Sequence, residues 1–585
     1  FSAGSAGAVA GGLVGGIYVE QAGSSAHTVT VSHVNFTGGS VPLTVTAQTL
    51  DGGSRGAAFA GGLIGYIQTD SAAYIRYEVS ENSAAGNPAN STFACDTEIL
   101  ATQNGVGPAY AGGLFGYNAF NLTDSGATDG LHFRLTASEH AFRVTAMQSA
   151  LSSAGGKNLY DVSAGLYSSR LQAGYALSDF TLYADNAEVT AGRTAGSAAT
   201  GDIAAGGFAG KASGDGAAAA ISNVTMQFGE DVSVNALGYS YDSQYAHSSG
   251  AGADTGNNVY AGGFIGYIQN YGVADNGQAT ASNAKLSNIT VRFGSSSGYA
   301  VRGVQNAASG NADYKTEGYV GGVFGMLANC SARNLIFEGA PGGSLIYFTS
   351  SNNPNTASVG GLVGATRSGA NTSASYGSGN LSYSDYAIAG GTVENAHVVG
   401  RAYYAPPSEG EITEEGTDPT AVQSGHNYDI YVGGAIGVFG SERGNISATV
   451  SDIYVYDTVV EAIGEQYMRT YAGGVFGGIW YSGSLSAADC AVIGSNVTAS
   501  SVSFHAHAGG IAGLLQSCSV TACHVLDSSV AAATEADTVY MQTGRNRDWE
   551  WFGWGDWYPV YGDVSIFGSV GGIYGNLTGS NQAVS

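Results

Sequence analysis

The stretch Tyr260-Ala-Gly-Gly-Phe-Ile-Gly-Tyr267 decides how this chain is expected to fold. Its centre is the pentapeptide Gly-Gly-Φ-Φ-Gly, in which Φ is apolar, and eleven clear copies occur along the 585 residues. Their first glycines are Gly11, Gly61, Gly112, Gly206, Gly262, Gly321, Gly360, Gly433, Gly473, Gly509 and Gly571. Such a recurrence is the signature of stacked repeats, each of which packs only against its neighbours. The pattern predicts a single solenoid domain over residues 1–585.

The spacing of the copies sets the expected size of the repeat. Successive first glycines are separated by 50, 51, 94, 56, 59, 39, 73, 40, 36 and 62 residues, and a decayed twelfth copy at Ala164-Gly-Leu-Tyr167 divides the gap of 94. A repeat of about 36–60 residues is long for one turn of a β-solenoid, so we expect two turns in each. Twelve repeats at about 4.8 Å per turn then give a rod of roughly 110 Å.

The residues around each copy predict a strand with two apolar faces. In a strand alternate residues share a face, so Tyr260 and Phe264 lie on one side and Ala261 and Ile265 on the other. We therefore expect this strand to be buried on both faces, with glycines that allow a positive φ or close backbone approach at a corner. Other copies carry tyrosine at the position of Tyr260, which predicts a ladder of stacked rings: Tyr110, Tyr319, Tyr431 and Tyr471.

A second recurring segment lies between the copies. Apolar and polar residues alternate in residues 221–228, 286–293, 450–456 and 520–526, which is the period-2 pattern of a strand. Together the two segments predict an all-β fold, a parallel β-solenoid of about twelve repeats.

The repeats resemble the GLUG motif, a Gly-Gly-Leu-Val-Gly-centred repeat of large bacterial surface proteins. The strand Thr521-Ala-Cys-His-Val525 resembles the second element of that family, in which Asn-Cys often opens the strand. The resemblance covers essentially the whole chain, although tyrosine often follows the third glycine and the spacing is irregular. It implies a secreted or surface-anchored β-solenoid of the kind found in adhesins, with no catalytic residues to carry over.

Charge and composition limit the classes of molecule that this chain is expected to bind. The formal net charge of −26 disfavours binding to nucleic acid. The sequence contains no run of 18 apolar residues, so it predicts no membrane span. The chain begins at Phe1 and stops soon after the last copy, so we expect a fragment of a longer protein. Five cysteines are spread without a CxxC motif. The nearest pair, Cys518 and Cys523, either bridges adjacent strands or, like the other three, fills small spaces in the core.

Two insertions are candidate binding loops. The first, at about 401–425, is acidic and rich in proline, and its carboxylates are either ligands for Ca²⁺ or part of a solvated loop: Glu409, Glu411, Glu414, Glu415 and Asp418. The second, at about 541–563, is rich in tryptophan: Trp549, Trp551, Trp554 and Trp557, accompanied by Tyr558, Arg545 and Arg547. This cluster indicates a surface for a host or matrix glycan or protein, a contact between protomers, or a structural cover.

No other pattern predicts a cofactor or a catalytic site. Asn223 and Asn288 lie in Asn-x-Ser/Thr sequons inside expected strands, where we expect an inward hydrogen-bonded ladder. His505 and His507 are adjacent to a glycine motif and indicate packing before metal ligation. We therefore expect a non-enzymatic extracellular or cell-surface protein, a rigid stalk that presents loops for attachment. The alternatives are a protomer of a self-assembling extracellular fibre or layer and, third, a polysaccharide lyase or hydrolase.

Overall fold

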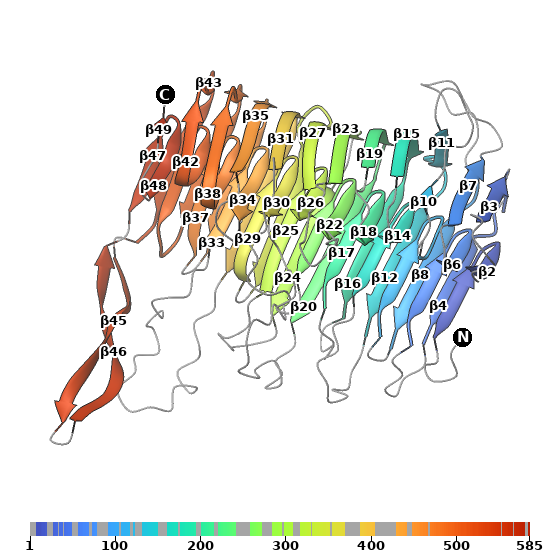
Figure 1. Cartoon of the computed structure of the whole chain (residues 1–585), viewed down its shortest axis with the longest axis horizontal. Coiled ribbons are helices and arrows are strands. Elements are labelled where there is room, and N and C mark those ends of the chain that lie inside the picture. Colours follow the sequence, from blue (N-terminus) through green and yellow to red (C-terminus); the bar gives the residue numbers. More distant parts are fainter. Residues whose placement is uncertain are drawn as a thin grey trace, which may run out of the picture.

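A computed structural model describes most of the chain, and every element in the described residues is a β-strand. These residues are 7–19, 27–32, 34–38, 40–49, 56–69, 73–78, 92–104, 107–117, 121–122, 131–149, 161–172, 176–194, 201–215, 220–240, 258–271, 284–294, 298–307, 316–328, 330–351, 354–368, 386–403, 429–441, 447–465, 468–536, 538–550, 553–565, 567–578 and 583–584. Parallel strands stack along the long axis of the molecule (Figure 1), so the predicted parallel β-solenoid is confirmed.

A repeat forms one coil, and a typical coil has four strands. In the fifth coil these are β17 (Ile203–Gly206), β18 (Ala209–Asp215), β19 (Ala220–Phe228) and β20 (Ser233–Ser240). The next motif strand, β21 (Val259–Gly262), already pairs in parallel with β17. The expectation of two turns per repeat is therefore wrong, because the chain folds back within each turn and one turn takes up the length of a whole repeat. Twelve motif strands are separated by eleven steps of about 4.8 Å, which gives a stack of about 53 Å rather than 110 Å.

The strands that carry the glycine motif form the motif sheet, with twelve members. Besides β17 and β21 they are β1 (Ala8–Gly11), β5 (Ala58–Gly61), β9 (Ala109–Gly112), β13 (Val162–Gly165), β25 (Thr316–Gly321), β29 (Pro354–Gly360), β33 (Asp429–Gly433), β37 (Arg469–Gly473), β41 (Ala506–Gly509) and β47 (Gly568–Gly571). The decayed copy at Gly165 takes its place in this sheet, in register with Gly112 and Gly206.

The strands that follow each motif form a sheet of nineteen members, here called the bent sheet. Besides β18 and β19 they are β11 (Leu131–Thr136), β14 (Ser168–Gln172), β15 (Ala176–Ala184), β22 (Ile265–Tyr271), β23 (Ala284–Phe293), β26 (Phe324–Ala328), β27 (Cys330–Glu338), β30 (Val363–Ser368), β31 (Tyr386–Glu394), β34 (Ile436–Ser441), β35 (Ser447–Tyr456), β38 (Phe476–Ala488), β39 (Ala491–Ile493), β42 (Ala512–Thr521), β43 (His524–Leu526), β48 (Tyr574–Thr578) and β49 (Ala583–Val584).

The last strand of each coil belongs to the outer sheet, which has eleven members. Besides β20 they are β4 (Leu43–Gln48), β8 (Thr97–Gln103), β12 (Phe142–Gln148), β16 (Ala187–Arg193), β24 (Tyr299–Ala307), β28 (Ser344–Ser351), β32 (Ala396–Tyr403), β36 (Val459–Gly464), β40 (Asn496–Ser501) and β44 (Ser529–Thr534). Small sheets complete the first coils, from β2 (Val14–Val19), β6 (Ile64–Thr69), β3 (His27–Ser32), β7 (Ala73–Glu78) and β10 (Asn121–Leu122).

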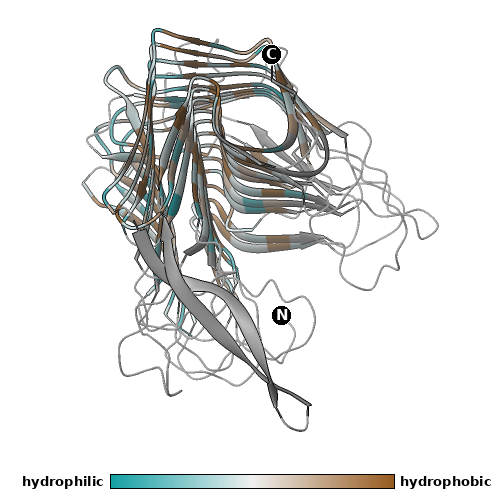
Figure 2. Cartoon of the chain, turned by 90° about the vertical axis from the view of Figure 1, so that its left-hand side faces the viewer, coloured by the Kyte–Doolittle hydropathy of each residue, from teal (hydrophilic) through white to brown (hydrophobic). Residues whose placement is uncertain are grey.

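The motif sheet lies in the middle of the molecule and is buried on both faces, as its two apolar faces predict. One face contributes residues such as Val259 and Ala261 to the main core, which extends through every complete coil. The other face carries Tyr260 and packs against the bent sheet in a second apolar cluster. Seen along the stack, the coils lie over one another, so equivalent positions form continuous columns (Figure 2).

The three glycines of the motif are required by close backbone approach, and none of those at Gly262, Gly263 and Gly266 has a positive φ. A Cβ on Gly262 would lie 2.1 Å from the carbonyl oxygen of Ile265 in its own turn. One on Gly263 would lie 2.1 Å from the carbonyl oxygen of Gly322 in the next coil. One on Gly266 would lie 2.6 Å from the carbonyl oxygen of Ala205 in the preceding motif strand. The motif thus permits a sharp turn, tight stacking of coils and close contact between two sheets.

The predicted tyrosine ladder is present on the second face of the motif sheet. The rings of Tyr260 and Tyr319 stack with centroids 5.5 Å apart, and those of Tyr431 and Tyr471 with centroids 5.0 Å apart. Phe59 extends the ladder next to Tyr110 at 5.4 Å. Offset stacking of this kind adds to the free energy of burying the rings.

An asparagine ladder also forms, but it faces outward and not inward. Asn223 donates to Asp179 at 2.9 Å, Asn288 donates to Asn223 at 2.8 Å, and Asn334 donates to Asn288 at 2.9 Å. Asn223, Asn288 and Asn334 are exposed and have φ between 52° and 55°. Each of the three bends its own strand of the bent sheet at an equivalent position along that strand. Asn and Asp tolerate a positive φ better than most residues, which explains why one of them occupies a position inside a strand pattern.

Among the described residues there is no helix long and apolar enough to cross a membrane.

Candidate functional site

The Trp-rich insertion forms an antiparallel hairpin of two strands, β45 (Thr538–Glu550) and β46 (Gly553–Ser565). The hairpin is a sheet of its own and leaves the stack near its C-terminal end (Figure 1). Trp549 lies opposite Trp554, and Arg547 lies opposite Trp557. The same pairing sets Arg545 opposite Pro559 and Asn546 opposite Tyr558, while Trp551 lies outside the described residues. The fold therefore brings most of the predicted aromatic and basic positions together on one hairpin.

The first residues of the acidic insertion, 401–403, belong to β32, and the rest of it lies outside the described residues. Its five candidate carboxylates lie outside the described residues: Glu409, Glu411, Glu414, Glu415 and Asp418. In the part of the chain that the structure describes, no group of three or more His, Cys, Asp or Glu side chains is arranged to hold a metal ion.

The cysteines adopt an arrangement that the sequence did not indicate. Cys518 lies in register with Leu485, so it is level with Leu485 and not with Cys523. Cys523 is instead level with Cys490, because the residues after them, Ala491 and His524, are paired. None of the five cysteines, all of which are described, forms a disulfide, and four of the five are buried.

Of the two neighbouring histidines, His507 is packed in the tyrosine ladder, and His505 packs against Phe567 beside it. The His507 ring stacks on Tyr471 with centroids 5.1 Å apart, and its Nδ1 lies 2.5 Å from the Ser569 hydroxyl. Burial lowers the pKa of His507 to about 4, and nearby His505 and Arg469 add to this effect. Ser569 in turn donates to the carbonyl oxygen of Gly575 at 2.6 Å. This arrangement is a structural contact, as the sequence indicated.

Buried charges fill a gap in the tyrosine ladder. Where the motif strands carry Ser163 and Ala204, the facing strands of the bent sheet carry Arg170 and Lys211. Lys211 Nζ lies 2.9 Å from Asp161 Oδ2 and 3.0 Å from Asp202 Oδ2, and Arg170 lies 3.5 Å from Asp161.

The protonation of this ionic group follows from burial and pairing. Burial alone would raise the pKa of Asp161, but Lys211 and Arg170 hold it below its usual value. Burial raises the pKa of Asp202, with the charge of Asp161 adding to this effect. Arg170 and Lys211 thus share one site with two carboxylates between the two sheets. At this site long basic side chains take the place of aromatic rings.

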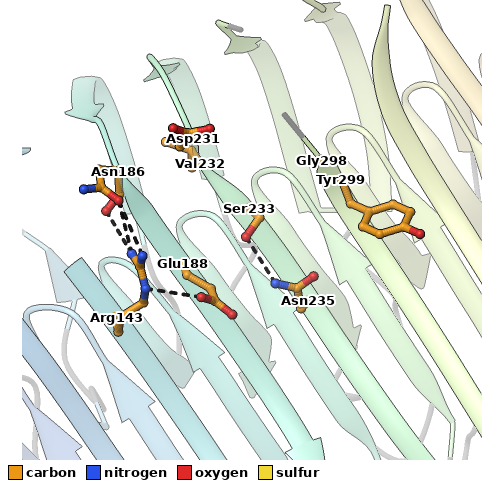
Figure 3. Close-up of a pocket in the computed structure, with 9 residues that line it drawn as sticks. All are labelled: Arg143, Asn186, Glu188, Asp231, Val232, Ser233, Asn235, Gly298 and Tyr299. Carbon is orange, nitrogen blue, oxygen red and sulfur yellow. Dashed lines mark hydrogen bonds and ion pairs between the residues drawn. The ribbon is translucent and has the colours of Figure 1, made fainter. Parts of the chain in front are cut away.

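A hollow of about 320 Å³ lies on the solvent side of the outer sheet and is the candidate binding site (Figure 3). It extends across four coils, from Arg143 on β12 to Tyr299 on β24. The residues that line it are Arg143, Asn186, Glu188, Asp231, Val232, Ser233, Asn235, Gly298 and Tyr299.

The register of the outer sheet explains why the hollow exists. Arg143, Glu188 and Ser233 occupy one column on successive strands, and Ser233 has the shortest side chain of the three. The next strand has an irregularity between Tyr299 and Val301 that interrupts this column. A small residue thus lies between long side chains on one side and an aromatic ring on the other, as Figure 3 shows.

The walls of the hollow are held by contacts among themselves and with their neighbours. Arg143 Nε lies 3.2 Å from Glu188 Oε2, and Arg143 Nη1 donates to the Asn186 carbonyl oxygen at 3.1 Å. Asn235 donates to the Ser233 hydroxyl at 3.2 Å.

The Tyr299 wall is fixed in the same way. Its ring packs against Tyr347 with centroids 5.0 Å apart, and the Arg302 guanidinium lies 4.6 Å from its centroid. The hollow thus combines planar polar groups with one fixed aromatic ring.

Sequence reasoning missed this hollow because its residues come from four repeats and no local motif marks them. The one signal was the outward column of the outer sheet, which can be read only once the register between coils is known. The chain matches no family model, no curated protein and no solved structure in the comparisons made with it.

Proposed function

We propose that this chain is the rigid part of an extracellular surface protein that attaches to a host or matrix glycan or protein. The observation that supports this proposal most is the union of a continuous solenoid with an independent hairpin rich in Trp and Arg. A stack whose coils share backbone hydrogen bonds along three long sheets resists bending, so it suits a stalk. The resemblance to GLUG-repeat adhesins agrees with this assignment.

The hairpin allows a direct test, because its ends are paired. Thr538 lies opposite Ser565, so residues 538–565 can be replaced by a short Gly-Gly link without separating the coils on either side. We expect the wild-type protein to bind members of a glycan and matrix-protein array, and the deletion to lose most of that binding while its circular dichroism and melting temperature stay the same. Equal binding by both proteins would assign attachment to another surface, and no binding by either would reject an adhesive role.

A second candidate function is a protomer of a self-assembling fibre. The first coil exposes Val41 (68%) and Tyr18 (55%), and the last coil exposes Val570 (55%) and Phe567 (53%). Tyr18 and Val570 lie on the outermost described strands of their sheets, and Val41 and Phe567 lie just before such strands, where a further coil can add through backbone hydrogen bonds.

Assembly is tested by electron microscopy and sedimentation. If the fibre proposal holds, wild-type protein forms filaments and Val570→Lys shortens or abolishes them. Tyr454→Lys, at a position 36% exposed on the body of the stack, serves as the control and leaves them intact. Single short rods for wild-type protein at every concentration would reject this candidate.

A further inference from the structure

We propose that the hollow on the outer sheet is a subsite for a neutral saccharide. The inference deepens the attachment function proposed above, because it names a ligand class and a second place of contact.

Chemistry of the lining favours a hydroxyl-rich ligand. Sugar hydroxyls donate and accept together, so they suit planar groups such as the Glu188 carboxylate, the Asn235 amide and the Arg143 guanidinium. Arg143 and Glu188 are 39% and 44% exposed, so both present polar atoms to solvent while they hold each other in place. The apolar face of a sugar ring needs an aromatic neighbour, and Tyr299 supplies one.

Charge favours a neutral ligand over an acidic one. Arg143 is balanced by Glu188 at 3.2 Å, and the lining adds the carboxylate of Asp231. The only cation among the lining residues is therefore already paired, and the whole chain carries a net charge of −26. With Arg302 beside the Tyr299 ring, the site has two guanidinium groups and two carboxylates, so an acidic polysaccharide would find no surplus of positive charge there and would be repelled at long range.

The residues that line the hollow are held in place before a ligand binds. The column that carries Arg143, Glu188 and Ser233 is fixed by backbone pairing with both neighbouring strands. Asn235 is only 9% exposed, so its side chain is held by its surroundings before any ligand arrives. A site held in this way loses little conformational entropy on binding, which is a large part of the cost for weak polar ligands.

The test uses the full chain and neutral oligosaccharides of glucose, galactose and mannose, with binding measured by saturation-transfer NMR and calorimetry. Ser233→Tyr fills the hollow without removing any of the charged groups, and Tyr299→Ala removes the aromatic wall. We expect each to weaken binding by about tenfold or more. Ser529→Tyr places the same side chain in the same column on β44, the last strand of the outer sheet, and leaves binding unchanged.

The outcomes separate this inference from the proposed function. Loss of binding in Ser233→Tyr with retention in Ser529→Tyr supports the subsite, whatever the hairpin does. Equal saccharide binding by wild type and Ser233→Tyr overturns the subsite, and so does the absence of binding to any neutral saccharide. In either case the hairpin deletion still decides the attachment function by itself.

A separate observation indicates a modification site. Cys490 and Cys523 lie on adjacent coils between two pairs of residues in register, Ala488 with Thr521 and Ala491 with His524. Each sulfur donates to the carbonyl oxygen two residues earlier at 3.3 Å, so the two side chains point the same way. We infer that these two thiols are the site of an inter-coil disulfide, since strand spacing of about 4.8 Å falls within the usual Cα separation of disulfides.

Formation of this bond needs a small disulfide oxidant such as oxidised glutathione. The hydrogen bond from Cys490 lowers the pKa of Cys523 to about 7, and Cys523 is the more accessible of the two thiols. The Cys523 thiolate attacks one sulfur of the oxidant, which breaks the oxidant's S–S bond, forms a mixed disulfide and releases one glutathione thiolate, which takes a proton from water. Cys490 then attacks the mixed disulfide and releases the second, and its proton goes to that leaving thiolate.

Thiol counting after oxidation tests the pair. We expect wild type and Cys518→Ser each to lose two thiols and Cys523→Ser to lose none. In oxidised Cys518→Ser, chymotryptic cleavage after Phe504 should leave the peptides that contain Cys490 and Cys523 joined by the disulfide. A mass decrease of two hydrogen atoms accompanies the bond. Retention of all five thiols by the folded wild type, or a bond that persists in Cys523→Ser, would overturn the assignment.

Discussion

At the scale of single residues, the second glycine of the motif shows how strongly the stack depends on the absence of a Cβ. Gly263→Ala sets a methyl group 2.1 Å from the carbonyl oxygen of Gly322, and the backbone cannot yield without separating the coils. We expect a loss of about 3 kcal/mol in unfolding free energy. Thermal or urea unfolding measures this loss.

The chain contains a matched control for that substitution. Gly572 has the same place in the last motif, yet a Cβ there meets no atom within 4 Å. Gly572→Ala should therefore change stability by less than about 0.5 kcal/mol. Equal effects of the two substitutions would show that backbone conformation, and not contact between coils, selects the glycine.

Protonation of His507 makes stability depend on pH. This side chain is 2% exposed, and its pKa falls from 6.5 to about 4 on folding. A histidine with a depressed folded pKa contributes stability above pH 6.5, and that contribution is lost as the pH falls from 6.5 toward 4, by up to about 3 kcal/mol. We expect His507→Phe, which keeps a ring beside Tyr471, to flatten the stability profile in this window. The same profile in His507→Phe and wild type would contradict the assignment, and His524→Asn at an exposed position is the control.

At the scale of the element, the outward asparagine ladder predicts a loss of stability for a substitution at Asn288 and a gain for a substitution at Ala522. Asn288 has φ 54° and both gives and receives a ladder hydrogen bond, so Asn288→Ala should cost about 1–2 kcal/mol. Asn288→Gly should cost less, because it keeps the backbone conformation. At the equivalent bend of a later coil Ala522 already has φ 52°, and Ala522→Gly should raise stability. Denaturant unfolding compares the three, and a loss of stability in Ala522→Gly would refute the argument.

The strands themselves could be predicted from sequence, whereas the arrangement of coils could not. The Gly-Gly-Φ-Φ-Gly strand and its alternating partner were located because period and glycine content are local signals. The number of coils per repeat was wrong because a repeat of given length can hold either two simple turns or one turn that folds back. Only the pairing of Gly262 with Gly321 decides between them.

The candidate sites show the same division. The Trp cluster is contiguous in sequence, so it could be found, but its pairing as an antiparallel hairpin was not predicted. Arg143, Ser233 and Tyr299 are far apart in sequence and become neighbours only through the register of the outer sheet. Likewise, Cys523 was grouped with Cys518 by proximity along the chain, but the coil places it level with Cys490.

At the scale of the whole molecule, one repeat should equal one step of length. Deleting residues 260–318 joins Val259 to Tyr319 at an equivalent point of the next coil, because Tyr260 and Tyr319 are paired. We expect the shortened chain to fold and its stack to shorten by about 4.8 Å, from a starting length of about 53 Å. Cryo-electron microscopy of the two proteins measures the difference. Shortening of the stack by twice the strand spacing would instead show that each repeat forms two turns.

The ionic group around Lys211 has a consequence for the order in which coils assemble. Most positions in the two facing columns carry aromatic or small residues, so a chain that slipped by a whole coil during folding would still bury acceptable neighbours. Arg170 and Lys211 are exceptions, and Lys211 bridges Asp161 and Asp202, which directly precede two successive motif strands. A slipped chain would bury that ammonium group without both counter-charges, at a cost of several kcal/mol. The group therefore acts as a registration mark that distinguishes the native alignment from its near-copies.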